Sequence, residues 1–242
     1  LPIRLPPLNE QEHIVGRIDS LAAQIEEAEL TGQQIERQWN ALLRSTFSQI
    51  VIGASHDKMG NVAPLVRRKT SPRFGEEFPE LGIRSFGKGT FHKPPLDYVS
   101  VGSKKLYSIE PGDLVFNNVF AWEGAIAVAQ PQDAGRFGSH RFITCVPKTG
   151  VAKAEFLWFY FLTPEGLQRI GEASPGGAGR NRTLGLEKLA EINVPVPNYE
   201  TQVTFTELLR KVRHMQDVRD SARRELKVML PSVLDRAFKG AL

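Results

Sequence analysis

Hydrophobic residues recur at helical spacing in two long stretches, one towards each end of the chain. Their steps alternate between three and four residues, as in helices that pack along a neighbouring helix. The stripe positions are Ile14, Ile18, Leu21, Ile25, Ala28, Ile35, Trp39 and Leu42 in the first stretch, and Leu208, Val212, Met215, Val218, Ala222, Leu226, Met229, Val233 and Ala237 in the second. This pattern predicts two long helices that form an antiparallel coiled coil. Packing of both helices on a globular core is the alternative.

The middle of the chain carries shorter apolar runs separated by turns with glycine and proline. Strand-like runs occupy 81–86, 105–109, 113–116, 125–129 and 142–146, and helical patterns occupy 155–162, 164–170 and 186–190. The helix at 155–162 is almost wholly apolar, so we expect it to be buried. The predicted fold class is α+β, a mixed α/β globular domain flanked in sequence by the two long helices.

The two ends of the chain repeat one another. Pro6-Pro7-Leu8-Asn9-Glu10-Gln11 precedes the first helix, and Val194-Pro195-Val196-Pro197-Asn198 precedes the second. Gly53 and Gly240 follow the two helices as stop signals. The repeat predicts three segments: 1–53 with a Pro-rich strand and a long helix, 54–198 as the globular domain, and 199–242 with the second long helix.

Charge is distributed unevenly along the 242 residues, whose net charge is +4. Residues 54–190 hold 18 basic and 13 acidic side chains, whereas 10–44 hold 3 basic and 7 acidic ones. A basic middle between less basic helices suits a domain that binds a polyanion.

The composition also limits compartment and metal chemistry. The single cysteine, Cys145, excludes an internal disulfide framework and a cysteine-rich zinc site, and the five histidines show no metal-ligand spacing. No apolar run approaches the roughly 20 residues of a membrane span, and no signal-peptide pattern opens the sequence. A cytoplasmic protein is expected.

Sequence motifs of common enzymes do not occur. The sequence contains no G-x-x-x-x-G-K-[ST] loop, no G-x-G-x-x-G after a strand and no Gly-x-Ser-x-Gly elbow. The Asn- or Asp-Pro-Pro-aromatic tetrapeptide of amino-methyltransferases is also missing, and Lys93-Pro94-Pro95-Leu96 does not replace it. We therefore expect no catalytic residue and no cofactor in this chain.

The order of these motifs resembles the DNA-specificity subunit of type I restriction–modification systems. The similarity rests on Pro6 to Gln11 before a long helix, Gly112-Asp113-Leu114-Val115-Phe116, a Gly-rich basic loop, Leu186-Glu187-Lys188-Leu189, and the ending Leu230-Pro231-Ser232 with Gly240. The subunits of that family have two target-recognition domains, whereas this chain matches one half. The missing half is either cut away or supplied by a second copy.

The resemblance implies a set of partners. Double-stranded DNA would be bound by the central domain, and methyltransferase subunits would dock beside the helices, with motor–nuclease restriction subunits outside them. S-adenosylmethionine, ATP and Mg²⁺ would then belong to those partners. A homodimer through the long helices would read an inverted repeat.

Several polar loops carry donors suited to DNA. Arg67, Arg68 and Lys69 can meet guanine or, for any one of them, more often a phosphate. The loop at 85–93 combines two glycines with further candidates, and we expect its Phe86 in the core. The candidates in this loop are Lys88, Thr90, His92 and Lys93.

Further candidates follow in three places. Asn117 and Asn118 can pair with adenine or cap their own turn, and Ser139, His140 and Arg141 open a strand. The loop 174–182 presents a backbone accessible to phosphate, with an ordinary surface loop as the alternative. Its candidates are Gly177, Arg180, Asn181 and Arg182.

Three other functions remain open from the sequence. A stand-alone DNA-modifying or DNA-cleaving enzyme would need catalytic groups that converge from distant positions. A binder of single-stranded RNA would need exposed aromatic platforms. A coiled-coil scaffold without sequence readout would leave the basic, Gly-rich loops unexplained.

Overall fold

The computed structural model describes residues 7–176 and 182–238, which fall into two compact units. Unit 1 combines the two ends of the chain, 1–49 and 207–242, and unit 2 comprises 50–206. The mixed α/β domain and the two long helices predicted from the sequence are confirmed.

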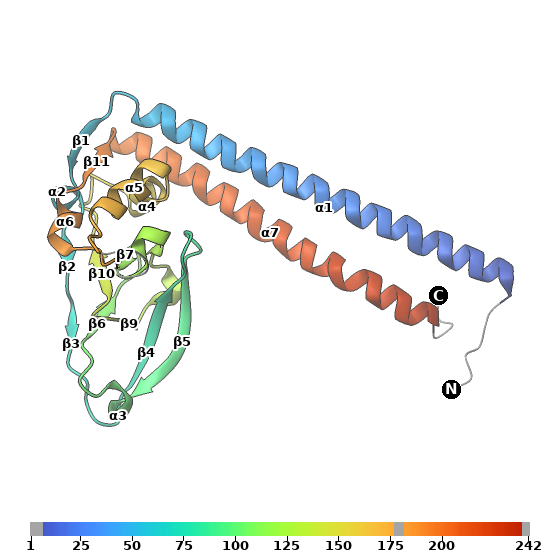
Figure 1. Ribbon diagram of the computed structural model, residues 1–242, viewed down its shortest axis with the longest axis horizontal. Coiled ribbons are helices and arrows are strands. Elements are labelled where there is room, and N and C mark those ends of the chain that lie inside the picture. The colour runs from blue at the N-terminus through green and yellow to red at the C-terminus, as the bar shows by residue number, and fades with distance from the viewer. Residues whose placement is uncertain (1–6, 177–181, 239–242) are drawn as a thin grey trace. The chain divides into compact units, whose positions relative to one another are not determined.

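Unit 1 is built from α1 (Leu8–Val51) and most of α7 (Tyr199–Phe238). Arg219 of α7 lies 3.1 Å from Glu36 of α1, and Arg223 lies 3.6 Å from Glu29. Residue numbers fall along α1 as they rise along α7, so the helices are antiparallel (Figure 1). Opposite charges therefore link the acidic first helix to the second.

The buried stripe on both helices differs by one residue from the predicted one in several turns. Leu42 is 48% exposed, whereas its neighbour Leu43 is buried. Met215 and Val218 are also exposed, and Arg219 takes the inward position with its side chain only 20% exposed. Arg219 can do so because its guanidinium reaches Glu36 and also donates to the carbonyl of Gly32 at 3.1 Å. Val212 is buried as predicted.

The ends of the helices follow local rules. Gly53, with φ of 71°, is the second residue after the end of α1, so the predicted glycine stop is confirmed there. Pro231 lies inside α7, and Gly240 lies outside the described residues.

Unit 2 contains a five-stranded sheet in the order β3-β6-β9-β4-β5, a four-stranded sheet in the order β2-β10-β7-β8, and the pair β1-β11. The strands are β1 (Ser55–Lys58), β2 (Leu65–Val66), β3 (Lys69–Thr70), β4 (Glu77–Ile83), β5 (Thr90–Asp97), β6 (Leu106–Ile109), β7 (Leu114–Asn117), β8 (Ile126–Val128), β9 (Arg136–Ser139), β10 (Phe142–Cys145) and β11 (Asn193–Val196). The helices of this unit are α2 (Met59–Val62), α3 (Tyr98–Val101), η1 (Ala121–Glu123), η2 (Pro131–Asp133), α4 (Ala154–Phe161), α5 (Pro164–Glu172) and α6 (Leu186–Ala190).

The core of unit 2 forms where the strands are apolar on both faces. Every residue of β8 and β10 is buried, and α4 covers β7 and β8, with its Phe161 edge-on to Phe116 of β7 at 5.3 Å. The prediction of a buried apolar helix at 155–162 is confirmed. Burial of aromatic rings at this spacing stabilises the unit beyond the area removed from water.

The segment predicted as a flexible loop at 85–93 is only partly one. It forms a short turn and then enters β5, which pairs antiparallel with β4. The prolines Pro94 and Pro95 obscured this strand, because proline lacks the N–H of a central strand. β5 tolerates them since it is the edge of its sheet.

Candidate nucleic-acid interface

A short turn between β4 and β5 is bonded to η1, although the two are far apart in sequence. The backbone N–H of Phe86 donates to Glu123 O at 2.9 Å, and that of Gly87 donates to Gly124 O at 2.8 Å. Arg84 N–H closes the turn on Gly89 O at 2.9 Å. The turn therefore has a defined backbone position.

Two further loops are bonded to the end of β7. The N–H of Asn118 donates to Arg141 O, and Leu184 N–H donates to Asn118 O, both at 2.8 Å. We call residues 84–92, 117–124, 139–141 and 182–184 the rim cluster, because these backbone bonds join them into one surface region of unit 2.

Cations of the rim cluster lie over aromatic rings. Arg84 lies 4.8 Å from the ring centre of Phe91, Lys88 5.8 Å from that of Phe86, and Arg182 5.6 Å from that of Trp122. The three cationic residues are exposed. A cation held by a ring keeps its charge while losing some of its freedom, which lowers the entropy cost of binding an anion.

Phe86 is not a core residue, so that expectation is wrong. Its side chain is 73% exposed, and it is the one described non-glycine residue with a positive φ, 62°. The two bonds from the turn to η1 impose this conformation on the backbone, and the ring is left in solvent under Lys88. A strained residue that presents an aromatic ring is a feature of binding sites.

Of the two asparagines at the end of β7, the side chain of Asn117 is used locally. The Oδ1 of Asn117 accepts the N–H of Val119 at 3.1 Å, which is the turn cap that the sequence left open as an alternative. The Oδ1 of Asn118 is buried without a hydrogen-bond partner in the described part of the chain.

Thr90 and His92 share one carboxylate. The Thr90 hydroxyl donates to Asp133 Oδ2 at 2.9 Å, and His92 Nε2 lies 2.9 Å from Asp133 Oδ1. Asp133 is fully buried, while the His92 side chain is 40% exposed. A buried acid thus sets the orientation of two more exposed side chains.

The remaining predicted loop residues lie at two positions. His140 and Arg141 form the exposed turn between β9 and β10, and Ser139 Oγ accepts the N–H of Arg141 at 3.3 Å. Lys93 is half-buried on β5, next to the rim cluster in sequence. Gly177, Arg180 and Asn181 lie outside the described residues.

The basic residues predicted at 67–69 do not lie in the rim cluster. They contact β6 and the turn between β6 and β7. Arg68 Nη1 donates to Asp113 Oδ2 at 2.6 Å and Arg68 Nη2 to Asp113 Oδ1 at 3.1 Å. Arg67 lies 4.8 Å from the ring centre of Tyr107, and Lys69 is exposed. The three basic residues were predicted to act as one group, but in the structure each has a different environment.

Ionisation in unit 2 follows burial and pairing. The hydrogen bonds that Arg68 donates to Asp113, against the opposing effect of burial, raise the pKa of Arg68 above its ordinary value. Burial, with a smaller contribution from the charge of Asp113, raises the pKa of Cys145 to about 12. The Cys145 thiol therefore stays protonated at neutral pH, as expected of a small buried apolar residue.

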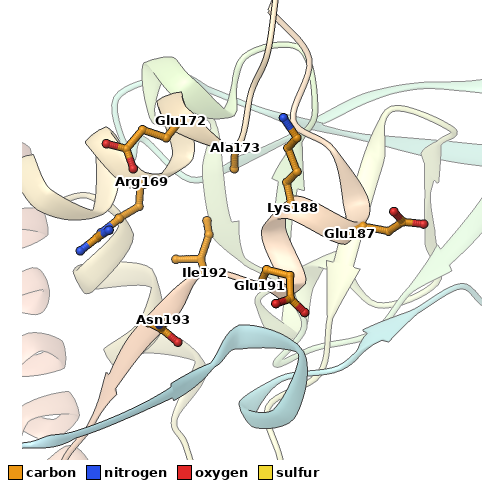
Figure 2. A pocket seen from close by; sticks show the side chains of 8 residues that line it. All are labelled: Arg169, Glu172, Ala173, Glu187, Lys188, Glu191, Ile192 and Asn193. Atoms are coloured by element: carbon orange, nitrogen blue, oxygen red, sulfur yellow. The ribbon is translucent and has the colours of Figure 1, made fainter.

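A separate hollow of about 480 Å³ lies between α5 and α6. Figure 2 shows that its charged side chains point in different directions, with Lys188 and Glu187 directed away from Arg169. Catalytic acids and bases must converge on one reacting atom. The side chains of this hollow do not converge in that way.

The described residues also bear on metals and membranes. Within 7–176 and 182–238, no group of three or more His, Cys, Asp or Glu side chains is arranged to hold a metal ion. In the same part of the chain, no helix combines the length and apolarity needed to cross a bilayer.

Sequence reasoning missed Arg84, Trp122 and Asp133. Arg84 lies inside the strand-like run predicted at 81–86, whereas β4 ends at Ile83, so only the structure shows that Arg84 begins the turn after a strand. Asp133 gave no local signal, because its importance comes from two residues more than forty positions away.

The fold defines a class of protein in which a mixed α/β unit lies in sequence between two long antiparallel helices. Solved structures similar to this chain include S subunits of type I restriction–modification systems. The HsdS subunit from Thermoanaerobacter tengcongensis is similar over 98% of this chain and 60% of its own, with a TM-score of 0.61 and 20% identity.

Two further solved chains have the same fold. One, from a structure of complex assembly and conformational transition of the type I R-M system, gives a TM-score of 0.60 at 18% identity over 98% of this chain and 61% of its own. The type I S subunit from M. genitalium gives 0.55 at 14% identity over 94% of this chain and 60% of its own. This chain thus spans about 60% of the length of these proteins. No protein-family model and no curated protein matches the sequence.

Proposed function

We propose that this chain is a specificity subunit, or half of one, that reads one half of a bipartite DNA target for a type I restriction–modification complex. The observation that carries the proposal is the fold likeness to S subunits over almost the whole chain. Fold alone does not assign function, so the rim cluster supplies the second argument. Its exposed, ring-held cations suit a phosphate backbone that runs past a base-reading surface.

The readout that we propose uses the rim cluster in two ways. Lys88, Arg84, Arg141 and Arg182 neutralise phosphates and set the register of the duplex. Thr90, His92 and His140 are closer in chemistry to base readers, since short polar side chains discriminate base edges. We assign Arg68 to holding Asp113, and the chain supplies no catalytic group.

The long helices act as spacers and docking surfaces in this proposal. The 44 residues of α1 span about 66 Å at about 1.5 Å per residue. Apolar side chains stay exposed along both helices in the described residues, and such side chains suit contact with methyltransferase subunits. They include Leu8, Val15, Leu30, Met215, Val218 and Val228.

Pairing with a second copy would complete a bipartite reader, because this chain covers about 60% of the S subunits that it resembles. Two-fold symmetry would then give an inverted-repeat target. Sedimentation at micromolar concentration is expected to show a dimer, and a strict monomer would contradict this part of the proposal.

Binding-site selection from randomised duplex DNA tests the proposed function. The chain, alone and with its methyltransferase partner, is expected to enrich one short half-site. The double variant Lys88→Ala/Arg182→Ala should weaken binding roughly tenfold at low salt. Lys104→Ala/Lys105→Ala removes the same charge from exposed positions outside the rim cluster and should bind like wild type. Failure to enrich any sequence would contradict the proposal.

A further inference from the structure

Asp133 restricts what Thr90 and His92 can offer to a ligand. A carboxylate accepts hydrogen bonds and donates none. The single hydroxyl proton of Thr90 is therefore directed to Asp133 Oδ2, which also accepts the backbone N–H of Gln130 at 2.8 Å. Thr90 keeps only its oxygen lone pairs for any other partner.

The same argument sets the tautomer of His92. Its Nε2 must carry the proton that meets Asp133 Oδ1 at 2.9 Å. In the neutral ring, Nδ1 then has no proton and is an acceptor. Within the described residues, no hydrogen bond engages His92 Nδ1. The ring is 40% exposed although the carboxylate is 1% exposed, so its other edge is open to solvent.

Both acceptors emerge on one face of an edge strand. Thr90 and His92 are two residues apart on β5, and residues at that spacing share a face. Arg84 Nη1 donates to the Thr90 carbonyl at 2.6 Å, so a cation of the proposed phosphate-binding set lies beside them. In this arrangement the two acceptors can face a base edge while the neighbouring cation contacts a phosphate of the same strand.

We propose that Thr90 and His92 form an acceptor pair that shares the one N–H which the exocyclic amino group of a paired base presents in the major groove, and that Asp133 is its positioning residue. In the major groove, adenine N6 and cytosine N4 are donors, while guanine O6 and N7 and thymine O4 are acceptors. Two acceptors select adenine or cytosine at one position and reject guanine and thymine. This inference rests on the proposed function, since it assigns a specificity to the same rim cluster.

Asp133→Asn is the informative variant. The amide keeps an oxygen for Gln130 N–H and the Thr90 hydroxyl, and it presents its NH₂ to His92. His92 Nε2 must then accept, which moves the ring proton to Nδ1. The outward edge of His92 changes from acceptor to donor while Thr90 remains an acceptor, so the selection against guanine and thymine at this position is expected to be lost.

Imidazole ¹⁵N NMR of the full chain tests the tautomer directly. At about pH 8, where a free imidazole is neutral, wild-type His92 is expected to be protonated at Nε2 and Asp133→Asn at Nδ1. The signal is assigned by its loss in His92→Gln. A wild-type ring protonated at Nδ1 would overturn the inference.

Binding-site selection with the same variants tests the readout. His92→Gln keeps an exposed polar side chain and remains testable if Asp133→Asn does not fold. It should reduce the preference at one position by about five- to tenfold, and Thr90→Val should act at the same position. His56→Gln changes an exposed histidine of β1 and should leave the preference unchanged.

The outcomes separate the two proposals. A wild-type chain that enriches a site, with the same preference retained in His92→Gln and Thr90→Val, overturns the acceptor pair and leaves the proposed function intact. A wild-type chain that prefers no duplex sequence overturns both.

Discussion

Two buried carboxylates determine which polar residues of unit 2 are available to a ligand. Asp113 is 2% exposed and holds both terminal nitrogens of Arg68, while Asp133 is fully buried and holds Thr90 and His92. In the sequence, Arg68 and Lys69 are adjacent cations of equal interest. Their difference comes from Asp113, forty-five positions from Arg68, so no local pattern could reveal it.

Replacing Arg68 by alanine should destabilise the protein strongly. Removal of one partner leaves the buried Asp113 carboxylate uncompensated, which costs about 3 to 5 kcal/mol in comparable cases. Lys69→Ala is the matched control, and because Lys69 is exposed it should change the free energy of unfolding by less than about 0.5 kcal/mol. Urea unfolding followed by circular dichroism measures both, and equal stability of the two variants would contradict the structural role of Arg68.

Cys145 should resist alkylation in the native protein. Its pKa is raised to about 12 by burial, and only the thiolate is a good nucleophile. Iodoacetamide at about pH 8 is expected to modify the chain slowly without denaturant and rapidly in urea, because an unfolded thiol ionises near pH 8.5. Mass spectrometry over time gives the two rates. Rapid labelling of the folded chain would show that the thiol is accessible.

Among the elements, the turn between β4 and β5 depends most on glycine. Gly87 has φ of 65° and Gly89 has φ of 76°, a region that favours glycine. A Cβ on Gly87 would lie 2.4 Å from Leu162 Cδ1, whereas one on Gly89 would meet nothing within 4 Å. Alanine substitutions at the two positions therefore distinguish the cost of backbone strain from the cost of steric overlap.

Gly89→Ala should lower the free energy of unfolding by about 1 to 2 kcal/mol, because only the backbone is strained. Gly87→Ala should cost roughly 1 to 3 kcal/mol more, since Leu162 must also move. Thermal unfolding of both variants measures the difference. An equal loss of stability in the two variants would mean that Leu162 moves aside at no cost in free energy.

Hydrophobic periodicity predicted the two long helices but not every residue that faces inward. Their existence and antiparallel direction agree with the sequence prediction, but their inward positions do not all agree. Leu43 replaces Leu42, and Arg219 replaces Val218. A hydrophobic stripe cannot anticipate that an arginine lies inward, because the reason is Glu36 on the other helix.

For the whole molecule, DNA binding should weaken steeply as salt rises. Each phosphate neutralised by a cation contributes about 0.9 to the slope of log affinity against log salt. Lys88→Ala should therefore reduce that slope by about 1, and Lys105→Ala should not change it. Fluorescence anisotropy across a salt series measures the slopes. A Lys88→Ala slope equal to that of wild type would remove Lys88 from the phosphate contacts.

The sequence alone determined the broad organisation of this protein. Hydrophobic spacing and the glycine stop after α1 are local signals, and they were sufficient for two long helices, a mixed α/β middle and a buried helix at α4. The family resemblance drawn from the same motifs agrees with the fold of the solved S subunits.

Only the tertiary structure decided which side chains act together. It separated Arg68 from Lys69, exposed Phe86, converted a predicted loop into β5, and placed Asp133 under Thr90 and His92. Each of these outcomes depends on a hydrogen bond or a strand pairing between residues distant in sequence. Local patterns in the sequence indicate backbone preference and burial. The direction of a side-chain hydrogen bond and the partner of a charged group depend on residues that only the fold brings near.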